Sequence, residues 1–311
     1  MTARITQLIS AGNVVIDIVA TVDDLPERGG DVFASGGRLE PGGGFNLMLS
    51  ARRQGLPTAH AGTTGTGPFG ELARAGLLRE RITTLLAPVP GIDTGFDVAI
   101  IDRQGERTFV TVVGAEGALT AARLDTIEIA PTDAFYISGY CLLHPENRAA
   151  ILSRLPRLPE LITVVYDPGP LGHTVSAEDV DVVLSRADWW SGNDREAMLA
   201  TGLQDPNDAV VVRAARLPRG RVVVRTGRDG CLLGGPRGKV LAVPGYAVDV
   251  VDTNGAGDAH TGAFIAGLAA GLDPHHAAAR ANAVAALSVT RSGPATAPTG
   301  TEVDEFLESR G

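Results

Sequence analysis

The sequence predicts an α/β protein with a mostly parallel central sheet flanked by helices and a small additional β-sheet. Short apolar segments alternate with helical patterns along most of the 311 residues, which is typical of parallel sheets built from βα units. Two regions break this alternation, because strand-like segments follow one another there without a helix between them. Hydrophobic residues make up 44% of the chain, enough to fill the core of such a fold.

The periodicity places each element in order. Central strands are predicted at residues 7–11, 58–62, 134–138, 161–167, 189–192 and 221–226. Helices are predicted at 46–53, 70–79, 145–155, 195–201, 209–214 and 259–270, with another beginning after Asp273 and Pro274. The strand-like pairs are 14–19 with 31–39 and 96–102 with 107–113. We expect these pairs to form a discontinuous β lid, about residues 14–39 and 96–113, within one domain of residues 1–311.

Composition excludes several classes of partner. The formal net charge is −9 and no tract rich in Lys or Arg occurs, so neither nucleic acid nor an anionic membrane is an expected partner. The two cysteines, Cys141 and Cys231, have no metal-type spacing and favour a reducing compartment. No leader is identified, and the apolar stretches are too short or too interrupted to span a bilayer. We therefore expect a cytoplasmic protein.

The most informative segment is Val-Val-Asp-Thr-Asn-Gly-Ala-Gly-Asp at residues 250–258, which leads into a predicted helix. Gly255, Ala256 and Gly257 leave room for backbone N–H groups to converge at the positive end of that helix. Such an arrangement stabilises the charge on a transferred phosphoryl group, and Asp258 is placed to accept a proton from an attacking hydroxyl. An ordinary Gly-rich loop with Asp258 as a helix cap is the alternative reading.

This segment resembles the C-terminal signature of the ribokinase-like, or PfkB, carbohydrate kinases, and further resemblances follow in order from Gly12 to about Pro298. The resemblance implies a ribokinase-like fold and transfer of the γ-phosphoryl group of ATP, with Mg²⁺, to a hydroxyl of a small sugar or sugar derivative. It gives Asp258 the role of catalytic base and residues 255–257 that of the anion hole.

Two early motifs resemble the sugar site of this family. Gly-Asn-Val-Val-Ile-Asp at 12–17 implies that Asp17 binds sugar hydroxyls, which suits a carboxylate. Pro-Gly-Gly-Gly-Phe-Asn at 41–46 implies that Gly42, Gly43 and Asn46 also contact the substrate, although Pro41 stands where the family has a first Gly. A solvent-facing Asp and a flexible turn before a helix cap explain these residues equally simply.

The nucleotide side is implied by weaker motifs. Asn193 and Glu196 resemble the family's Asn-x-x-Glu, which orients Mg²⁺-bound water, although many surface helices begin this way. Thr226 and Gly227 lie in a loop that resembles the one beside phosphate or ribose, and a tight hairpin turn is the alternative. Asn282 falls where the family lines the adenine pocket, or else on a helix surface.

The segment 288–297 resembles the family loop that supplies carbonyl oxygens to a monovalent cation such as K⁺ beside Asp252. Residues 65–70 match a dinucleotide-binding pattern, but Pro68 interrupts it and no acidic residue ends a second strand at the required distance.

Two other functions stay open, a nucleoside kinase of the same family and a non-catalytic relative that binds a sugar or nucleotide. A free sugar is favoured because the lid strands carry few aromatic residues for stacking a base, with Phe33 and Phe109 the visible candidates. The open edges of a β lid favour a homodimer.

Overall fold

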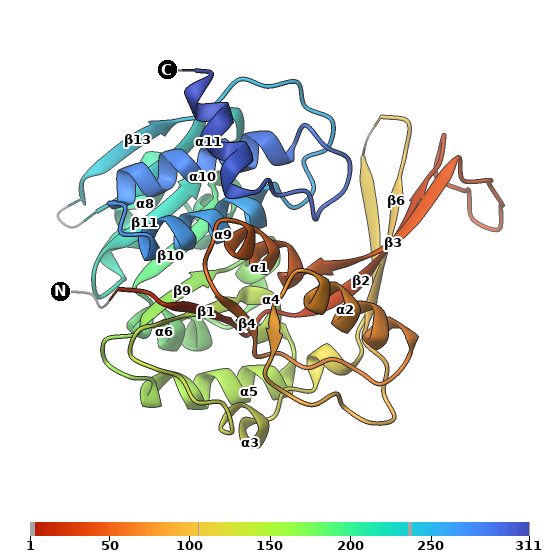
Figure 1. Ribbon diagram of the computed structural model, residues 1–311, viewed down its shortest axis with the longest axis horizontal. Helices are drawn as coiled ribbons and strands as arrows, with labels where there is room; N and C mark the ends of the chain where they lie inside the picture. Colours follow the sequence, from red (N-terminus) through yellow and green to blue (C-terminus); the bar gives the residue numbers. More distant parts are fainter. Residues whose placement is uncertain (1–3, 105, 236–237, 311) are drawn as a thin grey trace.

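The computed structural model describes residues 4–104, 106–235 and 238–310, and its main body is a nine-stranded sheet between two layers of helices (Figure 1). The strands are β1 (Gln7–Ser10), β4 (Thr58–His60), β5 (Thr83–Thr84), β8 (Asp133–Ser138), β9 (Thr163–Asp167), β10 (Trp189–Asn193), β11 (Arg221–Arg225), β12 (Gly230–Gly234) and β13 (Val240–Pro244). Their order is β13-β12-β11-β10-β9-β8-β1-β4-β5. All neighbours are parallel except that β12 is antiparallel to both β11 and β13. This confirms the mostly parallel sheet that the sequence predicts.

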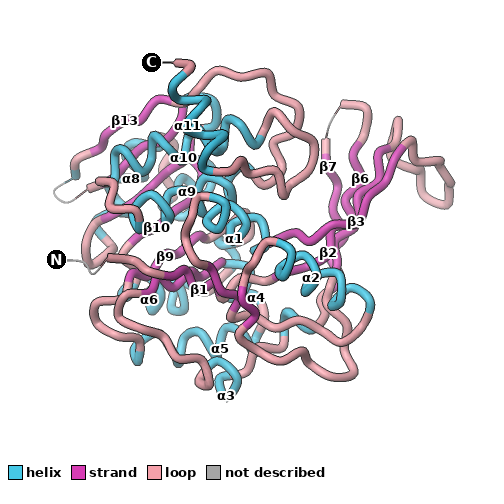
Figure 2. Tube along the Cα trace, viewed as in Figure 1, coloured by secondary structure: helices cyan, strands magenta, loops and turns pink. Residues whose placement is uncertain are grey.

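Helices cover both faces of this sheet. One face carries α1 (Gly44–Arg53), α2 (Pro68–Arg79), α9 (Ala256–Ala269), α10 (Pro274–Ser288) and α11 (Gly300–Glu308). The other carries α3 (Ala121–Leu124), α4 (Gly139–Leu143), α5 (Pro145–Arg154), α6 (Ala177–Arg186), α7 (Asp194–Thr201) and α8 (Pro206–Ala215). In Figure 2, α1, α9 and α10 lie above the sheet and α3, α5 and α6 below it. Each predicted helix is present within a few residues.

The strands alternate their side chains between two separate cores. Leu8 packs in the core under α1 and α9, whereas the next residue, Ile9, packs in the core beside α4 and α5. Successive residues of a strand point to opposite faces, and a parallel sheet covered on both sides is therefore apolar at every position. This explains why the central strands read as continuous apolar runs.

A second sheet of four strands stands beside the main body, at the right of Figure 1. It consists of β2 (Val14–Thr21), β3 (Gly36–Gly43), β6 (Phe96–Ile101) and β7 (Arg107–Val112), in the order β3-β2-β6-β7. The strand predicted at residues 31–39 is wrong at both ends, because β3 begins at Gly36 and continues to Gly43. Pro41 is tolerated within it because β3 is an edge strand, where a missing N–H costs no ladder bond.

Parallel topology brings polar residues together at one edge of the main sheet. Asp167, Asn193 and Arg225 are the last residues of the adjacent strands β9, β10 and β11. The carboxyl ends of parallel strands share one edge, which is where ligands bind in open α/β sheets. No helix in the described parts of the chain is long and apolar enough to cross a bilayer.

Candidate active site

Helix α9 begins with uncapped N–H groups, because the residue before it, Gly255, offers no side chain for capping. Gly255 has a φ of 73°, and a Cβ there would overlap the carbonyl oxygen of Pro294, so only glycine fits this corner. The first-turn N–H groups of Gly257 and Asp258 have no intrahelical acceptor. The anion-hole segment, residues 255–258, therefore presents free donors at the positive end of a helix.

Asp258 lies in the first turn of α9, and its pKa is raised. Burial, followed by the negative charge of Asp167, raises its pKa to about 7, while Arg225 and a hydrogen bond from Asn46 act in the opposite direction. A carboxyl group that titrates near neutral pH can both hold and release a proton, which suits a general base. The Asn46 side chain is buried, and its Oδ1 has no hydrogen-bond partner among the residues that the structure describes, so an acceptor atom is available beside Asp258.

Asp17 on β2 approaches the same place from the lid. Burial, then the charges of Asp97 and Glu40, raise the pKa of Asp17 to about 7, and Asp258 also contributes. Asp17 stands in register with Glu40 on β3 and with Asp97 on β6. The Oδ1 of Asp97 is buried and has no hydrogen-bond partner in the described part of the chain. Three carboxylates therefore meet on the lid near the predicted base.

The segment of residues 41–46 runs from the lid into helix α1. Gly42 lies against the Asp17 carboxylate, where any Cβ would collide with both carboxylate oxygens. Gly43 ends β3 and precedes α1, whose buried face includes Asn46. The structure thus gathers Asp17, Gly42, Asn46 and Asp258 around one site, although their contact with a substrate stays a prediction.

Asn193 and Glu196 form a helix-capping box at the start of α7. The Oδ1 of Asn193 accepts from the N–H of Glu196 at 2.7 Å, and the Oε2 of Glu196 accepts from the N–H of Asn193 at 2.7 Å. Burial, and then the charge of Asp167, raise the pKa of Glu196. Carboxylate and amide oxygens are ligands of the kind that Mg²⁺ accepts, directly or through water. These residues therefore fit Mg²⁺.

Arg225 is a candidate site residue that the sequence analysis did not single out. Its Nη1 donates to Thr261 Oγ1 at 2.7 Å, to Ser191 Oγ at 2.9 Å and to Asp167 Oδ2 at 3.2 Å. Its Nη2 lies 3.5 Å from Glu196 Oε2.

The guanidinium also packs on the anion-hole segment, since a Cβ at Gly257 would lie 3.4 Å from Arg225 Nε. A buried positive charge thus stands beside the free N–H groups. The sequence contains one signal for this role, an arginine directly after Val-Val-Val. A charged residue at the carboxyl end of a buried strand rarely lies there without a partner of opposite charge.

The other nucleotide-side residues differ in their exposure. Gly227 follows β11 with an exposed backbone, and nothing lies within 4 Å of a Cβ placed there. Thr226 is half-buried next to it. Asn282 is buried, and its amide is occupied by Val243 O at 3.0 Å, Pro244 O at 2.9 Å and His260 Nε2 at 3.0 Å. A contact of Asn282 with adenine stays a prediction, and it would have to be made without new hydrogen bonds from this amide.

The region of residues 65–70 does not form a dinucleotide site. Asp93 fills the start of α2, where its Oδ1 accepts from Gly70 N at 2.8 Å and its Oδ2 from Phe69 N at 3.1 Å. A Cβ at Gly67 would collide with this carboxylate. A pyrophosphate would need these same N–H groups, so the structure argues against the dinucleotide alternative.

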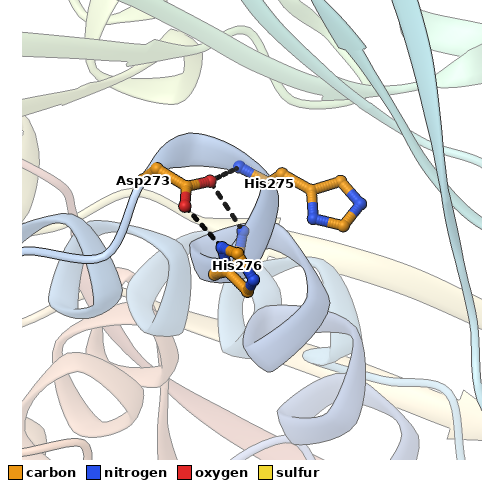
Figure 3. Close-up of side chains that lie close together, drawn as sticks. All are labelled: Asp273, His275 and His276. Carbon is orange, nitrogen blue, oxygen red and sulfur yellow. Dashed lines mark hydrogen bonds and ion pairs between the residues drawn. The ribbon is translucent and has the colours of Figure 1, made fainter.

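Asp273, His275 and His276 place potential metal ligands within 4.8 Å of one another at the start of α10. Figure 3 shows the Asp273 carboxylate bonded to the N–H groups of both histidines and to the His276 ring, with the His275 ring turned away. This is the side-chain cap of a helix, and we assign it no ligand.

Comparison with known proteins defines the class. Residues 5–300 match the sequence profile of the pfkB family carbohydrate kinases. The chain is 32% identical over 314 residues to an ATP-dependent ribose-1-phosphate kinase of Halopiger xanaduensis, covering 98% of this chain and 99% of that protein. It is 28% identical over 296 residues to an uncharacterized sugar kinase, YegV, of Escherichia coli, covering 94% and 91%. A structure of Arabidopsis thaliana ribokinase complexed with ribose and ATP has a TM-score of 0.81 at 22% identity, covering 98% and 99%.

The fold is therefore ribokinase-like, as the sequence predicts. The chain belongs to the pfkB family of carbohydrate kinases. It is an enzyme, a phosphotransferase with an alcohol group as acceptor.

Proposed function

We propose that this enzyme uses ATP and Mg²⁺ to phosphorylate a hydroxyl group of a neutral free sugar. The observation that carries the proposal is the position of Asp258. Its carboxyl group, with a pKa raised to about 7, lies beside the free N–H groups of α9 and the available Oδ1 of Asn46. This combination provides a base for the hydroxyl proton, donors for the transferred phosphoryl group and an acceptor that orients the substrate.

The proposed reaction follows from these positions. Asp17 and Asn46 hold the sugar so that one hydroxyl points at Asp258, which takes its proton as the oxygen attacks the γ-phosphorus of ATP. The bond from that phosphorus to the β,γ-bridging oxygen breaks, and ADP leaves. The N–H groups of the anion-hole segment and the guanidinium of Arg225 stabilise the charge on that group. When bound, Mg²⁺ neutralises charge on the nucleotide phosphates, and Asn193 and Glu196 would hold it, through water.

ATP is supported as the phosphoryl donor by the name of the Halopiger relative and by the ligands of the Arabidopsis ribokinase structure. In this chain, Thr226 and Gly227 would lie along the nucleotide, where the open backbone at Gly227 leaves space for it.

The lid favours a neutral acceptor over an anionic one. Asp17, Glu40 and Asp97 stand in register across three strands, and the nearby Arg38 is paired with Glu40 at 2.6 Å. Carboxylates accept hydrogen bonds from adjacent hydroxyls but repel a phosphate or a second carboxylate. We therefore expect free sugars to be preferred over sugar phosphates, unlike the named substrate of the Halopiger relative.

Few lid aromatics are available to stack on a base. Phe33 is 98% exposed and Phe109 is 50% exposed, and Phe96 packs on Phe69 with ring centroids 5.1 Å apart. This supports a sugar over a nucleoside. The exposed edge strands β3 and β7 support a homodimer formed through the lid. A cytoplasmic location also stays a prediction.

The deciding experiment measures ATP consumption with Mg²⁺ across pentoses, hexoses, sugar acids, ribose-1-phosphate and nucleosides. We expect turnover on a neutral sugar, lost in Asp258→Asn. Turnover only on ribose-1-phosphate or a sugar acid would overturn the proposed substrate class. Turnover of any acceptor that survives in Asp258→Asn would overturn the role of the base.

A further inference from the structure

Asp252 joins the two loops that shape the anion-hole segment. Its Oδ1 accepts from the N–H of Asn254 at 2.8 Å, and its Oδ2 accepts from the N–H of Gly293 at 2.9 Å. Asn254 immediately precedes Gly255, and Gly293 precedes Pro294, whose carbonyl oxygen lies against Gly255. The position of this one carboxylate therefore fixes the corner at which α9 begins.

Two arginines of the lid reach Asp252. Arg107, the first residue of β7, hydrogen-bonds to Oδ1 through Nη2. Arg38 of β3 places its Nη2 3.8 Å from Oδ2. The side chain of Asp252 is 7% exposed and that of Arg107 21%. A buried carboxylate needs a positive partner, and here the partner is a guanidinium from the lid.

The same region does not fit a monovalent cation while Arg107 is in place. A cation beside Asp252 would need carboxylate and carbonyl oxygens with free lone pairs. The Oδ1 of Asp252 already accepts from Asn254 N and Arg107 Nη2, and its Oδ2 accepts from Gly293 N and faces the Arg38 guanidinium at 3.8 Å. In the loop of residues 288–297, the carbonyl oxygen of Val289 accepts from Val251 N at 2.7 Å and from Asp252 N at 3.1 Å. The carbonyl oxygen of Ser288 accepts from Arg291 N and Thr296 Oγ1. A second positive charge at this carboxylate would also be repelled by Arg107 and Arg38.

We propose that Arg107 takes the place of a monovalent cation and that this kinase does not depend on K⁺. Arg107 is a positioning residue: it neutralises Asp252, and Asp252 in turn holds the backbones of Asn254 and Gly293 around the anion-hole segment. Because the guanidinium is always charged and is carried by a lid strand, the active-site corner is completed by a contact between lid and main body rather than by an ion from solution.

The test compares potassium chloride with choline chloride at equal ionic strength, using two readouts. The first is the melting temperature, which needs no substrate, and the second is the turnover of the kinase, which rests on the proposed function. For the wild-type enzyme, we expect the same melting temperature and the same turnover in both salts. A higher melting temperature or a higher turnover with K⁺ would overturn the proposal.

Variants sharpen this result. Arg107→Gln removes the positive charge. We expect its turnover in choline chloride to fall about 10–100-fold, the usual effect of losing a residue that orients a functional group. In potassium chloride, its turnover should partly recover and its melting temperature should be higher. Arg107→Lys keeps the charge and should stay independent of K⁺. Arg103→Gln is the matched control, because Arg103 belongs to the same hairpin but pairs with Asp24 at 3.3 Å. A variant Arg107→Gln that behaves like Arg103→Gln would contradict the assignment.

The two readouts separate the proposals. If no acceptor is phosphorylated under any condition, the proposed function fails, and the melting temperatures of wild type and Arg107→Gln in the two salts still decide the role of Arg107. If Arg107→Gln does not fold, the wild-type comparison and Arg107→Lys decide it.

Discussion

The two sheets of this enzyme contribute opposite properties to one site. The nine-stranded sheet is covered by helices on both faces, and its strand β11 has Val222, Val223 and Val224 fully buried. In the lid, β7 exposes five of its six residues. The predicted base and anion hole belong to the buried layer, whereas Asp17 and Glu40 belong to the lid. We infer that chemistry is held on the covered layer and substrate selection on β2, the lid strand whose first residues are buried, while the outer strand β7 stays exposed.

The largest expected effect tests the buried layer. Asp258→Asn should lower turnover by about 10²–10⁴-fold, the usual contribution of a general base, without loss of folded structure. Steady-state kinetics and circular dichroism measure the two. Asp304→Asn, on the exposed face of α11, is the control and should change neither. A variant Asp258→Asn with wild-type turnover would show that the base lies elsewhere.

A pair of phenylalanine substitutions tests whether stability resides in the main body. Phe264 of α9 is 1% exposed and meets Trp189 edge-on with ring centroids 4.8 Å apart, so Phe264→Ala should cost about 3–5 kcal/mol of unfolding free energy. Phe109→Ala on the lid should change it by about 0.5 kcal/mol or less. Urea unfolding gives both values. Because the proposed homodimer forms through the lid, a cost at Phe109 that grows with protein concentration would place this ring in the dimer interface. A large cost at every concentration would contradict the difference in packing between the two sheets.

Arg225→Lys tests whether the guanidinium acts on the phosphoryl group. The lysine keeps a positive charge beside Asp167 and Glu196 but cannot reproduce the planar set of donors. Losing one hydrogen bond to a charged group costs about 1.5–3 kcal/mol, so turnover should fall about 10–100-fold while KM for the sugar stays near that of wild type. An increase in KM for the sugar at constant turnover would assign Arg225 to substrate binding.

Asp17→Asn should have the smallest effect, and it tests whether the lid binds the sugar through Asp17. In the folded state the pKa of Asp17 is raised to about 7, above its ordinary value of about 3.9. The folded protein therefore binds more protons than the unfolded chain between about pH 4 and pH 7, and Asp17 reduces stability as pH rises through that range.

Asn cannot ionise, so Asp17→Asn should be more stable than wild type at pH 8, by on the order of 1–3 kcal/mol, and similar to it near pH 4. Its KM for the sugar should increase. Unfolding measured at both pH values checks this. A variant less stable than wild type at pH 8 would show that the Asp17 carboxylate is held by stabilising contacts.

Local patterns in the sequence predicted the elements well where they are apolar and continuous. The helix after Asp273 is an example, because its cap and Pro274 both act within one turn. The predicted start of this strand is wrong because residues 31–34 have a strand-like composition but lie before the β2–β3 ladder, which begins where Gly36 stands opposite Thr21. The short edge strand β5 carries too few residues for any periodicity.

The candidate site residues also differ in how far the local sequence predicts them. The string at residues 252–258 is contiguous, and its glycines and aspartate are therefore enough to predict an anion hole and a base. Arg225 could not be predicted in this way, because its partners Asp167, Ser191 and Thr261 lie between 34 and 58 residues away in the chain. The parallel order of β9, β10 and β11 brings Asp167 and Ser191 beside Arg225, and the packing of α9 on the sheet brings Thr261 there.

The sequence by itself determined the family, the α/β layering and the loop that prepares a helix N-terminus for phosphate, because these depend on residues close together in the chain. The tertiary structure alone decided the charge environment. Asp252 meets Arg107 across 145 positions, and Asp17 meets Asp97 through strand register. Electrostatic interaction depends on distance in space and on burial, neither of which is readable from sequence spacing.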